Sequence, residues 1–235
     1  MKKEDRKIIK LKIFQEKAVF RVPYSLEVIE TYPLPPYSTV LGFIHNMMSK
    51  NNTIKDINIS IQGKYGNVLR EFVRYHKFEK KNNIGKFYPI IITSLIDVEL
   101  IIHIRMPTKE LHNELLFSLH NPPHFPYLGR PEDLITHMEI SEDYEHEVKI
   151  TDEMAINPYD SFIPFELAKN LEIKGIYYLV PGYYVLKLSK KKNENFRDFE
   201  IIKVVYAHKE EISDQIADKT IKVDSENIPI WWMRY

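Results

Sequence analysis

The 235-residue sequence contains no cysteine, and only 7 of its residues are glycine. The lack of cysteine excludes disulfides, thiolate metal sites and cysteine nucleophiles. There is no glycine-rich phosphate loop and no nucleophile elbow, so nucleotide hydrolysis and acyl transfer have no support. No apolar run is long enough to span a bilayer, and residues 1–12 are too rich in lysine for a signal peptide. We therefore expect a cytoplasmic protein with no membrane partner.

The formal net charge is zero. This value argues against a nucleic-acid partner, because proteins that neutralise phosphates usually carry a basic excess. The charges are unevenly distributed, however: basic side chains predominate in residues 1–92 and acidic ones in residues 93–172. The asymmetry suggests one surface for a polyanion and another for a different partner.

The hydrophobic content of 44% is enough for a core. Period-two alternation of apolar residues predicts five strands, near residues 8–20, 57–62, 69–78, 94–106 and 134–140. Apolar residues at helical spacing follow Ser38 or Thr39, and again follow Thr108, so each of these hydroxyl residues is a candidate helix cap. The order strand, helix, strand, strand region with a hairpin, helix, strand predicts an α+β protein with a ferredoxin-like βαββαβ unit.

Aromatic strand-like runs at 175–189 and 199–208 predict a second, smaller β-rich part. We place the ferredoxin-like domain at residues 1–145 and the β-rich domain at 146–235. A lysine-rich hairpin near 76–92 is expected to project from the first domain.

The segment 20–43 joins the first predicted strand to the first helix and carries four prolines and three tyrosines. Loops this long and apolar are often functional. Unstacked bases can lie on exposed tyrosines while arginine and lysine bind phosphates, so this loop is a candidate RNA-binding segment. Packing of the same aromatic rings onto the sheet is the alternative. The candidates are Arg21, Tyr24, Tyr32 and Tyr37.

Two strings within residues 20–133 are specific. The first is Phe20-Arg21-Val22-Pro23 with Thr31-Tyr32-Pro33-Leu34-Pro35-Pro36-Tyr37-Ser38-Thr39-Val40-Leu41-Gly42, and the second is Tyr127-Leu128-Gly129-Arg130-Pro131-Glu132-Asp133. Both closely resemble motifs of the fifth Cas family, RAMP-superfamily subunits of type I CRISPR Cascade complexes. The form that the chain resembles is that of type I-B.

The resemblance implies a subunit for antiviral defence that holds the 5′ handle of CRISPR RNA and caps the backbone filament. The implied partners are CRISPR RNA and the Cascade backbone and large subunits, with target DNA reached indirectly through the complex. It also implies that the projecting hairpin is the family's thumb, which wedges between the guide RNA and the adjoining subunit.

Individual residues fit this interpretation. Backbone amides at the start of the helix could bind a phosphate, with Ser38 and Thr39 adding hydroxyl donors. Gly129 allows close approach of RNA, and Arg130 can bind phosphate or stack on a base, unless it pairs with Glu132 or Asp133. The lysines of the hairpin tip are phosphate candidates or simply a solvated end. The predicted RNA-binding set is Arg21, Tyr24, Tyr32, Tyr37, Ser38, Thr39, Lys77, Lys80, Lys81, Gly129 and Arg130.

Catalysis is the main alternative function. Type I-C relatives cleave precursor CRISPR RNA with a tyrosine near the end of the first helix and a later Lys-His pair. Here methionine stands where that tyrosine would align, and the sequence contains no Lys-His dipeptide. His45 and His124 remain an alternative acid and base. We expect no catalytic residue and no enzyme activity.

Neither a metal nor a cofactor is expected. His120 and His124 have the spacing of helical metal ligands, but the two prolines between them exclude a continuous helix. A third interpretation is a protein-interaction adaptor that uses the acidic middle and the aromatic tail at 228–235. That tail is an exposed apolar patch if free, and an edge segment if it docks on the β-rich part.

Overall fold

The computed structural model describes residues 7–25, 28–50, 54–77, 86–151, 156–188 and 195–234. Lys80 and Lys81, two of the predicted RNA-binding residues, lie outside these ranges. Within them, no helix is both long and apolar enough to cross a bilayer.

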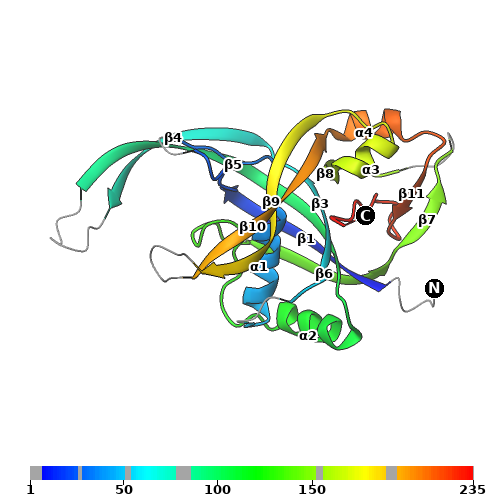
Figure 1. Ribbon diagram of the computed structural model, residues 1–235, viewed down its shortest axis with the longest axis horizontal. Helices are drawn as coiled ribbons and strands as arrows, with labels where there is room; N and C mark the ends of the chain where they lie inside the picture. Colours follow the sequence, from blue (N-terminus) through cyan, green and yellow to red (C-terminus); the bar gives the residue numbers. More distant parts are fainter. Residues whose placement is uncertain are drawn as a thin grey trace.

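One large, mostly antiparallel sheet organises the protein (Figure 1). Its main path runs in the order β6 (His137–Tyr144), β1 (Lys7–Ala18), β5 (Lys86–Arg105), β3 (Asn58–Lys64), β8 (Asp160–Pro164), β10 (Asn195–Ala207) and β9 (Ile176–Leu188). Two further strands, β2 (Val28–Ile29) and β4 (Asn67–Lys77), pair with the first half of β5. The predicted α+β class is confirmed.

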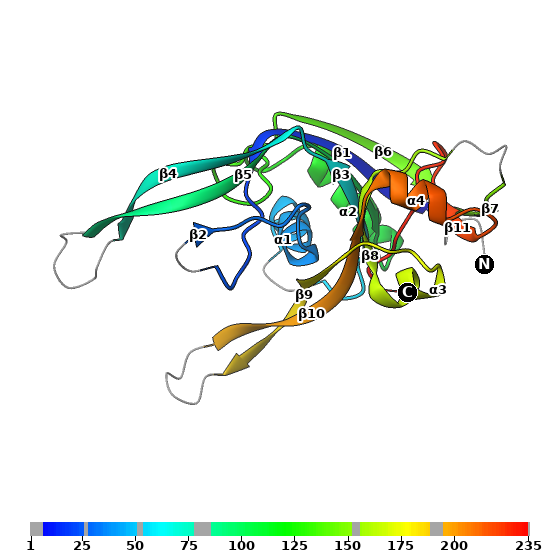
Figure 2. The same cartoon turned by 90° about the horizontal axis from the view of Figure 1, so that it is seen from above.

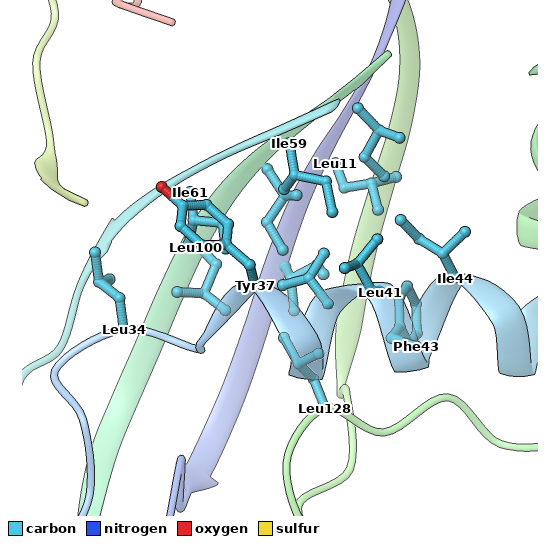
Figure 3. Close-up of a cluster of buried hydrophobic side chains, with 14 of the residues drawn as sticks. Leu11, Leu34, Tyr37, Leu41, Phe43, Ile44, Ile59, Ile61, Leu100 and Leu128 are labelled. Atoms are coloured by element: carbon cyan, nitrogen blue, oxygen red, sulfur yellow. The ribbon is translucent and has the colours of Figure 1, made fainter. Parts of the chain in front are cut away.

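Helices α1 (Tyr37–Met47) and α2 (Lys109–His120) pack against the same hydrophobic core. Strand β1 alternates as predicted, and its Leu11 joins Ile59, Leu100 and Ile44 of α1 in this core (Figure 3). Each such buried aliphatic side chain contributes about 1.5–3 kcal/mol relative to exposure. The chain order β1, α1, β3, β5, α2, β6 is the βαββαβ order that the alternation indicates, with β2 and β4 added.

The projecting hairpin is longer than the expected range of 76–92. Strand β4 pairs with β5 from Asn67 opposite Ile96 to Lys77 opposite Lys86, so β5 continues without interruption from the arm into the body of the sheet. A second hairpin, β9–β10, also extends from the body (Figure 2). We call the first hairpin the β4–β5 arm.

The C-terminal part continues the same sheet, because β8 pairs with β3 at Gln62 and Gly63. Helices α3 (Phe165–Asn170) and α4 (Lys209–Gln215) pack with the two-stranded sheet of β7 (His146–Lys149) and β11 (Thr220–Val223) around a smaller core. The division at residue 145 stays a prediction: two cores exist, but one sheet spans both parts.

The C-terminal aromatic segment is docked rather than free. The Trp231 backbone N–H donates to Ser60 Oγ at 2.9 Å, and the Met233 N–H donates to the Ile59 carbonyl at 2.8 Å. Trp231 and Trp232 are both buried. The segment is docked, as one of the two interpretations predicts, but it reaches β3 of the first part as well as β11 of the β-rich part, where the Ile230 N–H donates to the Lys222 carbonyl at 2.8 Å.

Beside this segment, the buried Lys10 ammonium lies 2.7 Å from Asp224 Oδ2 and 3.0 Å from Glu226 Oε1. His103 Nε2 lies 3.1 Å from the same Asp224 oxygen. Burial by itself raises the pKa of Asp224, but hydrogen bonds from His103 and Lys10 outweigh it and hold that pKa well below its ordinary value.

We predict that Lys10→Met lowers the free energy of unfolding by about 3 kcal/mol, because it leaves a buried carboxylate without its lysine partner. Lys10→Met combined with Asp224→Asn should recover part of this loss. Because the folded pKa of Asp224 is depressed, the stabilisation is present above the ordinary carboxyl pKa and is lost as pH falls toward the folded value. The gap between wild type and Lys10→Met in urea unfolding should therefore narrow in acid. An equal gap at acidic and neutral pH would contradict the prediction.

Candidate nucleic-acid interface

One carboxylate ties the second sequence string to the residue that directly precedes the first string. Asp133 is 2% exposed, and its Oδ2 accepts hydrogen bonds from the backbone N–H groups of Val19 and Arg130, each at 3.0 Å. Gln15 donates to the carbonyls of Leu128 and Asp133 at 3.0 and 2.7 Å. The loop 127–133 is therefore fixed against the end of β1, where the first string begins.

Gly129 occupies a position that only glycine suits. Its φ is +106°, and a Cβ there would lie 3.0 Å from both Asp133 Oδ2 and the Val19 carbonyl oxygen. Backbone conformation and close packing both require glycine here. The structure thus explains this glycine by its close packing against the end of β1, and the close approach of RNA at Gly129 stays a prediction.

Arg130 makes the carboxylate pairs that were its alternative. Its Nε and Nη2 donate to Asp133 at 3.1 and 2.8 Å, and Nη1 lies 3.1 Å from Glu132. Because this fork is already engaged, Arg130 positions the loop in this structure instead of presenting a free cation. Its direct contact with an RNA phosphate stays a prediction.

Two tyrosines of the opening loop are packing residues. Tyr37 is 0% exposed and points into the core beside Ile61 and Leu100 (Figure 3), where burial raises its pKa. Tyr32 is 3% exposed, and its hydroxyl donates to the Leu179 carbonyl at 2.9 Å, which attaches the loop to β9. Neither ring is accessible to a base, so their predicted stacking role is corrected to packing.

Arg21 and Tyr24 do lie on the surface. Tyr24 is 74% exposed, and Arg21 is exposed where the loop closes by a bridge to Thr31. The Phe20 N–H donates to Thr31 Oγ1 at 2.9 Å, so this base of the loop is held in place. These two residues remain candidates for RNA contact.

A groove of about 500 Å³ lies between α1, the loop 127–133 and the β9–β10 hairpin. It brings Ser38, Thr39 and Gly129 together from the two strings. Its lining also includes Gly42, His45, Asn46, Lys50, Tyr127, Gly182, Tyr183, Tyr184, Arg197 and Phe199. The hairpin residues were missed in the sequence because they are more than one hundred residues away from Ser38.

The start of α1 opens at this groove. Pro36 occupies the N-cap without a side-chain hydrogen bond to the first turn, and that turn contains no acidic residue. The first N–H groups of a helix lack intrahelical partners and carry partial positive charge. The Thr39 N–H already donates to the Pro36 carbonyl at 2.9 Å. The N–H groups of Tyr37 and Ser38, together with the half-buried hydroxyls of Ser38 and Thr39, form a set of donors suited to a phosphate.

Residues 8–201 match the family model described as "CRISPR-associated protein (Cas_Cas5)". The chain belongs to this family. No curated protein matches it.

Among solved structures, this Cas5-family chain is similar to a chain of a "CRISPR RNA-guided surveillance complex", with 11% identity, a TM-score of 0.57, and coverage of 94% of this chain and 92% of that one. It is also similar, with a TM-score of 0.41 and 11% identity, to a chain of the Type III-B Cmr-beta complex bound to cognate target RNA, covering 88% of this chain and 87% of that one. At 11% identity the likeness to the first of these chains concerns the fold.

The two histidines considered for catalysis differ in their surroundings in the Cas5-family fold. His45 Nδ1 lies 2.6 Å from the Leu41 carbonyl, and Nε2 accepts the Ile54 N–H at 2.8 Å, so both ring nitrogens are engaged. This arrangement fixes one neutral tautomer. His124 Nε2 lies 2.7 Å from Asn46 Nδ2 at the surface.

The β4–β5 arm carries a second basic and aromatic surface. Arg70, Phe72 and Arg74 alternate along β4 on one face, Phe72 is largely exposed, and the Arg74 guanidinium lies 4.2 Å from the Phe87 ring centroid. Lys77 ends β4 opposite Lys86. The period-two alternation of arginine and phenylalanine in β4 is visible in the sequence, whereas the predicted RNA-binding set includes only lysines from this hairpin.

We predict that alanine has opposite effects on the free energy of unfolding at two glycines of the groove. Gly129→Ala should lower the free energy of unfolding by about 1–3 kcal/mol, because it strains a positive φ and crowds Asp133. Gly42→Ala should raise it by about 0.5–1 kcal/mol, since Gly42 lies in a helix with nothing within 4 Å of its added Cβ. Urea unfolding of both variants measures the effects, and equal effects of the two substitutions would refute this account of Gly129.

Proposed function

We propose that this Cas5-family protein is a subunit of a type I CRISPR Cascade complex, of the I-B kind, that binds the 5′ handle of CRISPR RNA without cleaving it. The observation that carries the proposal is the groove, in which both family-specific strings and the open end of α1 come together. A polyanion is the ligand that this donor set suits best.

The charges around the groove support an RNA ligand. Lys50 and Arg197 line it, and no carboxylate is among its described lining residues. Lys50 pairs with Glu114 at 2.6 Å, so Arg197 is the more available cation. Arg21 and Tyr24 add a cation and an exposed ring on the opening loop. A single strand that combines phosphates with unstacked bases uses both kinds of group.

Membership of the family supports an assembly role. A subunit at the 5′ end of the guide would cap the backbone filament, contact the backbone and large subunits, and meet target DNA through the complex. The β4–β5 arm, with its exposed Phe72 and paired Arg74 and Phe87, has the length and surface for the thumb. We infer a cytoplasmic role in antiviral defence.

The surroundings of His45 support binding without cleavage. A general base needs a ring nitrogen free to accept a proton from the substrate, whereas Nε2 of His45 already accepts the Ile54 N–H. The absence of a Lys-His pair in the sequence points the same way. No observation favours the adaptor alternative, since the aromatic tail is buried within the chain.

The phosphate site is tested by Thr39→Glu. A carboxylate in the first turn is favourable for the helix, so the fold should keep its stability while the RNA phosphate is repelled. The affinity for the RNA recovered from the wild-type complex should fall about tenfold or more. The plot of log affinity against log salt concentration should become less steep by about one unit of slope, because one phosphate contact is lost. Asn113→Glu, which adds the same charge on α2, is the control. Unchanged RNA retention in the Thr39→Glu complex would refute the proposal.

The non-catalytic assignment is tested with repeat RNA and purified protein in the presence of a metal chelator. We expect the RNA to stay intact during prolonged incubation, because the acid–base pair of the cleaving relatives is absent. Gel electrophoresis of end-labelled RNA measures the outcome. Cleavage at one defined position that disappears in His124→Ala would overturn the assignment.

A further inference from the structure

Gly42 stands on the wall of the groove without a packing reason for its missing side chain. It lies inside α1, is exposed, and would have nothing within 4 Å of an added Cβ. Glycine weakens a helix interior relative to alanine. Because no described neighbour needs the space, the bare backbone at Gly42 leaves room for something outside the chain.

The facing wall is an aromatic surface on the second hairpin. Tyr184 of β9 is paired in register with Phe199 of β10, and their ring centroids are 5.6 Å apart at 56°. The Arg197 guanidinium lies 4.8 Å from the Tyr184 ring centroid. Phe199 is 37% exposed and Arg197 is exposed, so the cluster is only partly covered by its own neighbours.

A backbone irregularity follows Phe199 in β10. The strand register shifts between Phe199 and Ile201, as at a β-bulge. Bulges re-aim side chains at functional edges. Beyond the shift, Ile202 and Val204 turn to the main core, while Tyr184 and Phe199 line the groove.

We propose that the space between Gly42 and the Tyr184–Arg197–Phe199 cluster is a subsite for one unstacked base of the bound RNA. This inference rests on the proposed function and adds to it the place where a base, as opposed to a phosphate, is held. The base stacks on the aromatic pair, the open α1 backbone at Gly42 accommodates its other side, and Arg197 balances the adjoining phosphate.

Two observations favour a nucleobase over a protein side chain. The described lining residues include Lys50 and Arg197 and no carboxylate, which suits an anionic chain. The subsite also adjoins Ser38 and Thr39, so a base held there belongs to a nucleotide next to the phosphate at the start of α1. Stacking on aromatic rings tolerates any base, so the subsite adds affinity without strict sequence choice.

The test uses the reconstituted complex and the RNA that copurifies with it, sequenced and resynthesised with a single abasic site at each handle position in turn. For wild type, one position should lower affinity about tenfold more than its neighbours. Gly42→Phe, which fills the groove, and the double variant Tyr184→Leu/Phe199→Leu should each lose about tenfold on intact RNA. Removing the critical base from the RNA should not lower the affinity of these two variants any further.

Phe196→Leu, on the opposite face of the same hairpin, should bind within about twofold of wild type. Thermal unfolding checks that each variant is folded. If folded Gly42→Phe and the leucine double variant bind every RNA as wild type does, the subsite is refuted while handle binding stands. If they keep the RNA but lose a neighbouring Cascade subunit, the occupant is a protein and the subsite is refuted. If wild type retains no RNA, the proposed function itself fails.

Discussion

The buried carboxylate of Asp133 is the contact on which the candidate site depends. One side chain accepts from the Val19 N–H at the end of β1, from the Arg130 N–H, and from the Arg130 guanidinium. Burying a carboxylate is costly unless several donors satisfy it. The cost therefore makes the conformation of the loop 127–133 specific, and this conformation sets Gly129 at the groove beside the start of α1. Arg130 takes part in the same contact and so holds the loop as well.

The elements of the main sheet were predictable from sequence because their information is local. Alternation in β1 and β3 marks which side chains face the core, and Thr108 accepts the Leu111 N–H as the expected cap of α2. The length of β5 was not predictable in the same way. Its outer half pairs with β4 and β2, and its Ile90 and Ile92 form a small separate cluster with Val19 and Ile29, contacts that depend on segments distant in the sequence.

The candidate site was only partly predictable, for two physical reasons. A tyrosine next to prolines can pack or stack, and the choice at Tyr32 and Tyr37 depends on contacts with β9 and the core that local sequence does not contain. Tyr184 and Phe199 reach the groove from a distant hairpin, so no spacing rule connects them to Ser38. Gly42 carried a usable signal, since a glycine inside an amphipathic helix needs a reason. The two strings themselves correctly identified the family and the segments that meet.

The charge asymmetry along the chain has a different meaning in three dimensions. Strand β1, from the basic third, lies between β5 and β6, which belong mainly to the acidic middle. Lys7 accordingly pairs with Glu142 across β1 and β6 at 2.5 Å, and Lys64 pairs with Glu99 across β3 and β5 at 3.0 Å. Many basic and acidic side chains therefore form ion pairs between neighbouring strands, and they do not form two separate charged surfaces. Cations that remain outside such pairs within the described chain, among them Arg21 and Arg197, are the ones whose positions matter for a polyanion. The fold, and not the order of residues along the chain, decides which cations stay unpaired and where they lie. A chain with zero net charge can therefore still present a local surface for RNA.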